Sequence, residues 1–241
     1  MALKLSKNKR KIVLGIVKLM NENNIICLPI KIHEKQEYHV DLVVIKNKDL
    51  KKAESVLLNQ GYVKPFCTAI FWEIKKKFFK KGKIMIHLHK AISWNGVDYL
   101  NKENVWRRRI NLKGIPYTSK EDEYLILIAH SLFENKLITK DDFERLESLK
   151  SKNLNFNIIN SLAKKNNWYH GLRYFINHWP DNPYVPFKYF GLFGVTFKKF
   201  IMDLRKLRPI SSLWQLFSYT VIDYVICYRL AKKRYRKYRG G

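Results

Sequence analysis

The sequence predicts an α+β protein, in which a mixed sheet with helices is followed by a helical C-terminal half. Three observations lead to this prediction. Short runs of alternating apolar and polar residues share the first part of the chain with segments of helical spacing. From about residue 98, helical spacing prevails and is accompanied by N-terminal capping residues. At 241 residues, of which 46% are hydrophobic, the chain is long enough to bury a sizeable core.

The N-terminal half alternates between helical and strand-like segments. Residues 8–23 place Ile12 and Ile16 on one helical stripe, and EYHVDLVVI at 37–45 alternates like a strand with one buried face. Gly61 is typical of the end of a helix. In order, we expect a helix at 8–23, strands at 25–32 and 38–45, a helix at 46–62, and strands at 66–74 and 83–90, with the lysine-rich segment 75–83 as the turn between the last two.

Capping residues mark the start of two helices in the C-terminal half. Ser119 with Asp122, and Thr139 with Asp142, have the spacing of N-terminal capping boxes. Three prolines within 178–194 interrupt the helical spacing and predict a linker or docking loop. The expected helices run from Ser119 to about 135, from Thr139, and near 155–166, 168–178, 195–206 and 210–237. The expected division is an α/β domain at 1–115, a helical domain at 116–180, and a linker with basic amphipathic helices at 181–241.

The segment 210–230 has about the length of a membrane span but contains Gln215 and Asp223. Its apolar side chains gather on one helical face, which is the pattern of an amphipathic helix. We favour packing of this helix on the protein core. The alternatives are that it lies on an anionic membrane surface together with its basic tail, or that it spans the membrane.

The chain is strongly basic, with 47 Lys and Arg against 20 Asp and Glu and a formal net charge of +27. Such a charge favours polyanionic partners, and we expect RNA or a ribonucleoprotein, with an acidic membrane surface as the alternative. A lysine-rich proteome would account for part of the excess. The residues expected to contact nucleic acid are Lys75, Lys76, Lys77, Lys80, Lys81, Arg107, Arg108, Arg109, Arg234, Arg236, Lys237 and Arg239.

The three cysteines, Cys27, Cys67 and Cys227, form no CxxC pair and are odd in number. This pattern indicates a reducing compartment, and we expect no disulfide partner. The apolar stretch near the N-terminus is interrupted by Lys18 and does not have the pattern of a signal peptide. The sequence therefore predicts a cytoplasmic protein, with peripheral membrane association as the alternative.

Two pairs of polar side chains define a candidate site. His39 and Asp41 share one face of the 38–45 strand, and His87 and His89 share one face of the 83–90 strand. If these strands are neighbours, the four side chains meet. Imidazoles with one carboxylate suit zinc, iron or manganese, whereas magnesium requires hard oxygen ligands. The alternative is a hydrogen-bonded, metal-free group of histidines on the sheet surface.

Three segments together resemble the poorly characterised branch of the nucleotidyltransferase superfamily. They are HVDLVVIKNKDLKKAESVLLNQGY, IMIHLHKAI and GIPYTSKEDEYLILIAHSLF, within about residues 24–135. In that branch a strand carries two acids, a helix ends in LGY, a later strand reads DLH, and a helix begins with SPED. Asp41 matches the second acid, Leu57 to Tyr62 the helix end, Leu88 and His89 the LH, and Ser119 to Asp122 with His130 the SPED helix and its histidine.

The resemblance implies a nucleotidyltransferase fold in which three carboxylates on adjacent strands hold two divalent metals that brace a nucleoside triphosphate. This chain departs from that pattern. His39 and His87 stand where two of the acids are expected, and CLPIKI, with Pro29 and Lys31, replaces the upstream glycine turn. Glu37 shares the strand face and could supply one charge.

Asp41 is therefore the remaining catalytic carboxylate, and manganese or zinc is expected in preference to magnesium. Three functions stay open. The protein transfers a nucleotide from a triphosphate through a remodelled metal site, or is a catalytically degenerate relative that binds RNA or a ribonucleoprotein through its basic surface. The third alternative is a peripheral protein of a membrane surface.

Overall fold

The computed structural model describes residues 6–31, 37–65, 76–94, 97–179, 185–204 and 224–239. The chain forms two compact units. The first comprises residues 1–93 and 100–123, and the second comprises residues 94–99 and 124–241. The three-part division at 115 and 180 stays a prediction.

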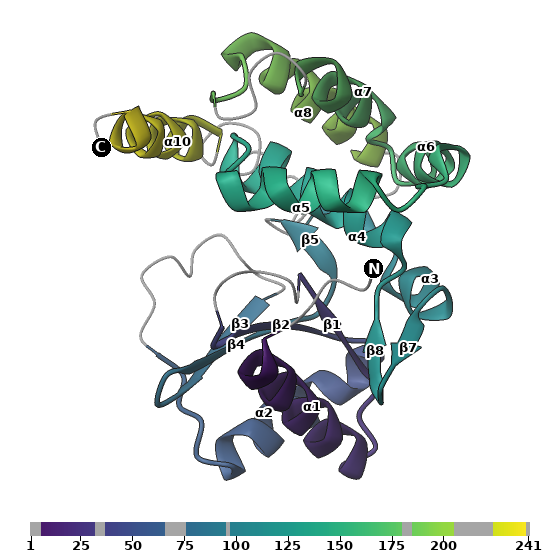
Figure 1. Ribbon diagram of the computed structural model, residues 1–241, viewed down its shortest axis with the longest axis vertical. Helices are drawn as coiled ribbons and strands as arrows, with labels where there is room; N and C mark the ends of the chain where they lie inside the picture. Colours follow the sequence, from purple (N-terminus) through teal and green to yellow (C-terminus); the bar gives the residue numbers. More distant parts are fainter. Residues whose placement is uncertain are drawn as a thin grey trace. The chain divides into compact units, whose positions relative to one another are not determined.

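The first unit is built on a four-stranded mixed sheet (Figure 1). Its strands are β1 (Cys27–Ile30), β2 (His39–Val44), β3 (Lys76–Lys81) and β4 (Ile84–His89), in the spatial order β1-β2-β4-β3. β2 and β4 are parallel, whereas β1 pairs with β2 and β3 pairs with β4 in antiparallel fashion. The α+β fold class expected from the sequence is confirmed.

Two helices, α1 (Lys7–Glu22) and α2 (Leu50–Asn59), lie on the same side of this sheet (Figure 1). They follow the helical spacing of the sequence, and a single 3₁₀ turn, η1 (Asn47–Asp49), leads into α2. The core contains Val13, Val17 and Met20 of α1, Ala53 and Leu57 of α2, and Val40, Leu42, Val44, Ile86 and Leu88 of the two central strands. Since side chains alternate along a strand, the residues between these positions lie on the opposite face of the sheet.

The lysine-rich segment expected as a turn is a strand, so that prediction is wrong. Lys76–Lys81 forms the edge strand β3, and only Gly82 and Lys83 make the turn into β4. Phe79 points into the core and is fully buried, while the lysines remain at the edge of the sheet. β3 is the last strand in the described sheet order, and on its outer side Lys80 forms an antiparallel bridge with Val63. The strand expected at 66–74 lies outside the described residues.

The segment 92–117 contains four short strands, although helical spacing was expected to prevail from about residue 98. They are β5 (Ile92–Trp94), β6 (Val97–Leu100), β7 (Ile110–Leu112) and β8 (Ile115–Tyr117), with the short helix α3 (Lys102–Arg107) between the two pairs. Lys113 and Gly114 both have positive φ, 53° and 81°, as a two-residue hairpin turn requires. The strands are too short to show alternation, which explains why the sequence did not reveal them.

The helices of the C-terminal half mostly follow the expected segments. They are α4 (Lys120–Ala129), the π-helical segment η3 (His130–Asn135), α5 (Lys140–Lys150), α6 (Phe156–Lys165), α7 (Tyr169–His178), α8 (Tyr189–Leu204) and α10 (Tyr224–Arg239). The backbone N–H groups of Asp122 and Asp142 donate to Ser119 Oγ and Thr139 Oγ1, as the capping boxes predicted. α8 begins at Tyr189, so the proline-containing loop is shorter than expected.

The second unit has its own aromatic core. Trp168 is buried and its Nε1–H donates to the carbonyl of Tyr99 at 2.9 Å, and the ring of Tyr99 stacks on Phe133. These contacts explain why residues 94–99 belong to this unit. None of the described helices is both long and apolar enough to cross a bilayer. Most of the segment 210–230 lies outside the described residues.

Candidate metal centre

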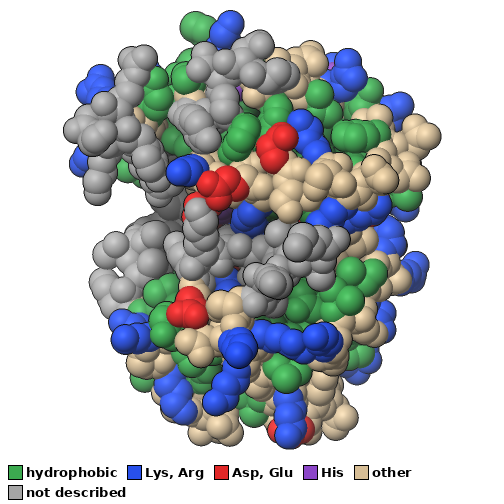
Figure 2. Space-filling view, in the orientation of Figure 1, with side chains coloured by type: hydrophobic (Ala, Val, Ile, Leu, Met, Phe, Trp, Pro, Cys, Tyr) green, Lys and Arg blue, Asp and Glu red, His purple; other side chains and the backbone are tan. Residues whose placement is uncertain are grey.

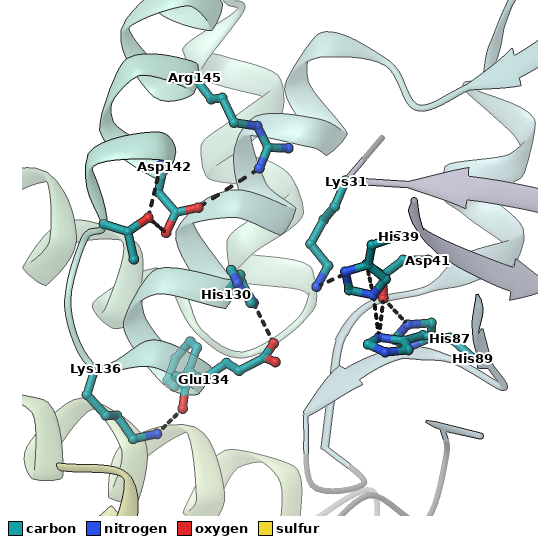
Figure 3. Close-up of polar contacts among 12 residues, drawn as sticks. Lys31, His39, Asp41, His87, His89, His130, Glu134, Lys136, Asp142 and Arg145 are labelled. Carbon is teal, nitrogen blue, oxygen red and sulfur yellow. Dashed lines mark hydrogen bonds and ion pairs between the residues drawn. The ribbon is translucent and has the colours of Figure 1, made fainter. Parts of the chain in front are cut away.

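The parallel pairing of β2 and β4 brings the predicted polar side chains together. In the register of these strands Asp41 lies opposite His87. His39 comes two residues before Asp41 on β2, and His89 comes two residues after His87 on β4, so that all four side chains lie on the same face of the sheet. His39 Nε2 is 2.8 Å from His87 Nδ1, His87 Nδ1 is 3.3 Å from Asp41 Oδ1, and His39 Nε2 is 3.7 Å from Asp41 Oδ2. His39, Asp41 and His87 thus offer three ligand atoms that all lie within 4.8 Å of one another (Figure 3).

His89 plays a different part from the other two histidines. Its Nε2–H donates to Asp41 Oδ1 at 2.7 Å, and it is not among the three residues whose ligand atoms all lie within 4.8 Å of one another. A carboxylate held by an imidazole in this way keeps a fixed orientation. His89, which the sequence suggested as a ligand, is therefore placed here as a hydrogen-bond donor to Asp41.

Lys31 is the residue of this cluster that the sequence did not single out. It follows β1, has a φ of 50°, and places its ammonium 3.7 Å from Asp41 Oδ2. Only 7% of Lys31 is exposed, and Figure 3 shows its side chain reaching toward Asp41 and the histidines. The glycine turn of the family is expected in this neighbourhood, and a left-handed conformation is one that glycine adopts most easily. The positive φ of a lysine here was not visible in any local pattern.

Glu37 does not supply a further charge to the cluster. Its carboxylate accepts a hydrogen bond from Ser6 Oγ at 3.0 Å, and Ser6 is also the N-cap of α1. Among the described residues, Asp41 is therefore the single carboxylate of this site.

Burial and neighbouring charges set the protonation of the cluster. Burial acts to raise the pKa of Asp41, but the Lys31 ammonium and hydrogen bonds from His87 and His89 outweigh it and hold this pKa well below its usual value. Burial lowers the pKa of His87 to about 3 and also lowers that of His89. His87 is thus neutral and Asp41 is ionised, and metal ligation requires this protonation state of both residues.

The residues do not fit the two-magnesium arrangement that the resemblance implies. One carboxylate in place of three leaves two dications without most of their compensating charge, and the Lys31 ammonium adds a further positive charge at 3.7 Å. The donor set fits one transition-metal ion instead. For ligands about 2.0–2.1 Å from such an ion, tetrahedral geometry places neighbouring donors roughly 3.3 Å apart. His87 Nδ1 lies at 2.8 Å from His39 Nε2 and at 3.3 Å from Asp41 Oδ1, near that value, while His39 Nε2 lies 3.7 Å from the other carboxylate oxygen, Asp41 Oδ2.

Several residues expected to contact nucleic acid make local contacts. Lys77 pairs with Glu54, and the Lys81 ammonium donates to the carbonyl of Gln60. Arg108 forms a two-point hydrogen bond to the Asp122 carboxylate, at 3.0 and 2.6 Å. The Arg109 guanidinium stacks 3.8 Å over the ring of Trp106. These contacts use part of the expected basic surface within the protein itself.

The other expected contact residues lie on the surface or beyond what can be described. Lys80, Arg107 and Arg236 are exposed, and Lys76 is half-buried on the sheet face of the histidines. Lys75 and the side chains of Arg234, Lys237 and Arg239 lie outside the described part of the structure. On the face shown in Figure 2, Lys and Arg side chains are spread over the described surface, and Asp and Glu side chains are sparse.

His130, which matches the histidine of the SPED helix, lies in the second unit. It is the first residue of the π-helical segment η3, and its Nδ1 is 2.5 Å from the carboxylate of Glu134 (Figure 3). π-helical turns often occur at functional sites because they redirect side chains. The sequence resemblance pointed to this histidine but gave no indication of its partner.

The mixed sheet, the helices on its apolar face and the polar cluster on adjacent strands define a nucleotidyltransferase-like protein. A family model described as "Uncharacterised nucleotidyltransferase" matches residues 40–179, which is more than half of the chain. The chain belongs to this family of uncharacterised nucleotidyltransferases, so the resemblance inferred from the sequence is confirmed. No curated protein and no solved structure matches it.

Proposed function

We propose that this protein transfers a nucleotide from a nucleoside triphosphate to an acceptor, with one divalent transition-metal ion, manganese or zinc, held by His39, Asp41 and His87. One observation carries the proposal. In a member of a nucleotidyltransferase family, three ligand atoms from adjacent parallel strands lie within 4.8 Å of one another, and the sequence resemblance expects the family's carboxylates at these residues.

The charges of the cluster support a triphosphate as substrate. Three carboxylates with two dications have a formal charge of +1. Here, Asp41 and the Lys31 ammonium cancel, and one dication leaves +2. Both arrangements present net positive charge to an anionic phosphate chain, and such charge stabilises the transition state of phosphoryl chemistry. Without an ion the same cluster is formally neutral and offers little attraction to a triphosphate.

The proposed reaction is a single displacement at phosphorus. An acceptor hydroxyl oxygen bonds to the α-phosphorus while the bond from that phosphorus to the oxygen bridging to the β-phosphate breaks. Pyrophosphate leaves with the bonding electron pair, and the hydroxyl proton passes to water. When bound, the ion lowers the cost of the charge that develops on the phosphate oxygens. His89 holds the Asp41 carboxylate in place by its hydrogen bond.

Label transfer tests this proposal. Metal-stripped protein is incubated with α-labelled triphosphates, total cellular RNA and protein, and magnesium, manganese or zinc in turn. We expect labelling with manganese or zinc that falls at least a hundredfold for Asp41→Asn, while Lys18→Met, an exposed change on α1, retains it. Absence of labelling with every metal contradicts the proposal.

The charge of the whole chain supports a second candidate, a catalytically degenerate family member that binds RNA or a ribonucleoprotein. The formal charge of +27 and the exposed Lys80, Arg107 and Arg236 are the observations that favour it. RNA binding that is unchanged in Asp41→Asn, in a protein without label transfer, is the expected result of this function. Flotation with acidic liposomes and no RNA binding would instead indicate a membrane surface as the partner.

A further inference from the structure

We propose that the Lys31 ammonium takes the place of one of the two divalent cations of a nucleotidyltransferase site, neutralising Asp41 when no ion is bound and contacting the polyphosphate when substrate is bound. This inference rests on the proposed function and assigns to Lys31 a role in binding phosphate. In this role Lys31 weakens the binding of the metal ion and strengthens the binding of the triphosphate.

The position of Lys31 carries the first step. Its Nζ lies 3.7 Å from Asp41 Oδ2, and its side chain is 8% exposed. The same Asp41 Oδ2 lies 3.7 Å from His39 Nε2, which is one of the candidate ligand atoms. A fixed positive charge therefore sits beside the ligand set.

The backbone gives the second step. β1 pairs with β2 so that Ile30 lies opposite Asp41, and Lys31 is the first residue beyond β1. A φ of 50° there turns the chain out of its extended course, and residues other than glycine rarely adopt this left-handed conformation. The chain thus leaves the sheet at the point where the lysine reaches the Asp41 carboxylate.

Charge gives the third step. A lysine ammonium is a compact cation with three donors, and it is a common phosphate ligand in nucleotide-binding proteins. A dication bound by Asp41 would be repelled by the same ammonium, since both positive charges would then share one carboxylate in a largely buried site. Both cations attract a triphosphate, whose oxygens carry several negative charges. Lys31 should therefore weaken the binding of the metal alone and strengthen the binding of triphosphate to the metal-loaded protein.

The test measures these two affinities separately. Isothermal titration calorimetry of EDTA-stripped protein with Zn²⁺ or Mn²⁺ gives the metal affinity. Titration of the metal-loaded protein with inorganic triphosphate gives the phosphate affinity. Wild type is compared with Lys31→Met, with Lys31→Arg, which keeps the charge, and with Lys18→Met, which removes one exposed positive charge from α1.

For Lys31→Met we expect metal affinity to rise at least tenfold and triphosphate affinity to fall at least tenfold. Lys31→Arg should retain triphosphate binding within about threefold, and Lys18→Met should change neither affinity beyond twofold. If Lys31→Met does not fold without metal, folding that is rescued by Zn²⁺ supports the inference, because the ion then supplies the missing positive charge.

Other outcomes overturn the inference. If Lys31→Met loses both affinities, the role of Lys31 is purely structural. If neither affinity changes, Lys31 takes part in binding neither the metal nor the triphosphate. Metal binding by Lys31→Met but not by wild type supports the inference while overturning the native metal centre of the proposed function. Metal binding by neither protein overturns both.

Discussion

Asp41 keeps its negative charge at a buried position because its neighbours replace the water that it has lost. Only 2% of this residue is exposed, and its carboxylate lies beside the Lys31 ammonium and accepts a hydrogen bond from His89. Breaking a buried ion pair by removing one partner costs more than the pair itself contributes, because the other charge stays in the interior.

The effects of substituting Asp41 and Lys31 on the free energy of unfolding should therefore not be additive. In metal-free protein we expect Asp41→Asn and Lys31→Met each to lower the free energy of unfolding by about 3–5 kcal/mol. The double variant should lose less than the sum by about 1–3 kcal/mol, since it removes both charges. Urea denaturation of the four proteins in EDTA at pH 7 checks this, and strictly additive losses would contradict the pairing.

The buried histidines predict a loss of stability in acid. The pKa of His87 is about 3 in the folded protein and about 6.5 in the unfolded chain, so the unfolded state binds the proton first. Above pH 6.5 the ring is neutral in both states and costs no stability. As the pH falls from 6.5 toward 3, the unfolded chain binds the proton and the free energy of unfolding decreases. At pH 5 the expected loss is about 2 kcal/mol for this residue.

Denaturation of EDTA-treated protein at pH 7 and pH 5 measures this decline. His87→Gln should reduce the difference between the two pH values by most of that amount. His170→Gln, which changes an exposed histidine of the second unit, serves as the matched control. An unchanged difference in His87→Gln would show that the ring is not held neutral.

At the scale of elements, the site depends on the register between β2 and β4. Parallel pairing puts Asp41 opposite His87, and a shift by one residue would send every polar side chain of β2 to the core face. Lys102 ties the ends of these strands together. Its buried ammonium donates to the carbonyls of Val44 and Lys90 and to Asn47 Oδ1, each at 2.8 Å.

Lys102→Met should therefore disturb both stability and metal binding. We expect a loss of about 2–4 kcal/mol in the free energy of unfolding, because three buried acceptors lose a charged donor. The affinity for Zn²⁺ should also fall severalfold, since the two ligand-bearing strands are less firmly aligned. Calorimetry and urea denaturation measure the two quantities. Loss of stability with unchanged metal affinity would separate Lys102 from the site.

The sequence revealed the strand face of His39 and Asp41, because alternation along one strand is a local property. It also suggested that His87 and His89 would meet them, since both pairs followed the same rule. Lys31 could not be found in this way. Its approach to Asp41 depends on the antiparallel pairing of β1 with β2 and on a positive φ, and neither leaves a signal in the composition of CLPIKI.

The lysines of β3 led to the wrong prediction that this segment is a turn. Six residues with four lysines resemble a turn, yet the position of Phe79 on the core face determines that the segment is a strand. The adjacent Phe78 faces the other way and contacts the ring of His87, with centroids 4.5 Å apart. The burial of one aromatic residue outweighs the local preference of the lysines for water.

At the scale of the whole molecule, the formal charge of +27 predicts binding to RNA that depends on salt. Neutralising phosphates releases counterions, so log affinity should fall linearly with log salt, with a slope of about −0.7 for each phosphate contacted on a single strand. Filter binding at increasing potassium chloride measures the slope. Reversing the charge at exposed positions with Lys80→Glu and Arg107→Glu should flatten it, whereas a slope near zero in wild type would contradict a polyanion partner.

The central claim is that one transition-metal ion replaces the two-magnesium arrangement in this family member. The most direct test is X-ray absorption spectroscopy of zinc-loaded protein at one equivalent per chain. We predict that two imidazole nitrogens coordinate the zinc at about 2.0–2.1 Å and that oxygen ligands complete the shell. The imidazole signal should be lost in the double variant His39→Gln/His87→Gln. A shell of oxygen ligands alone, or a spectrum unchanged in that variant, would contradict the account.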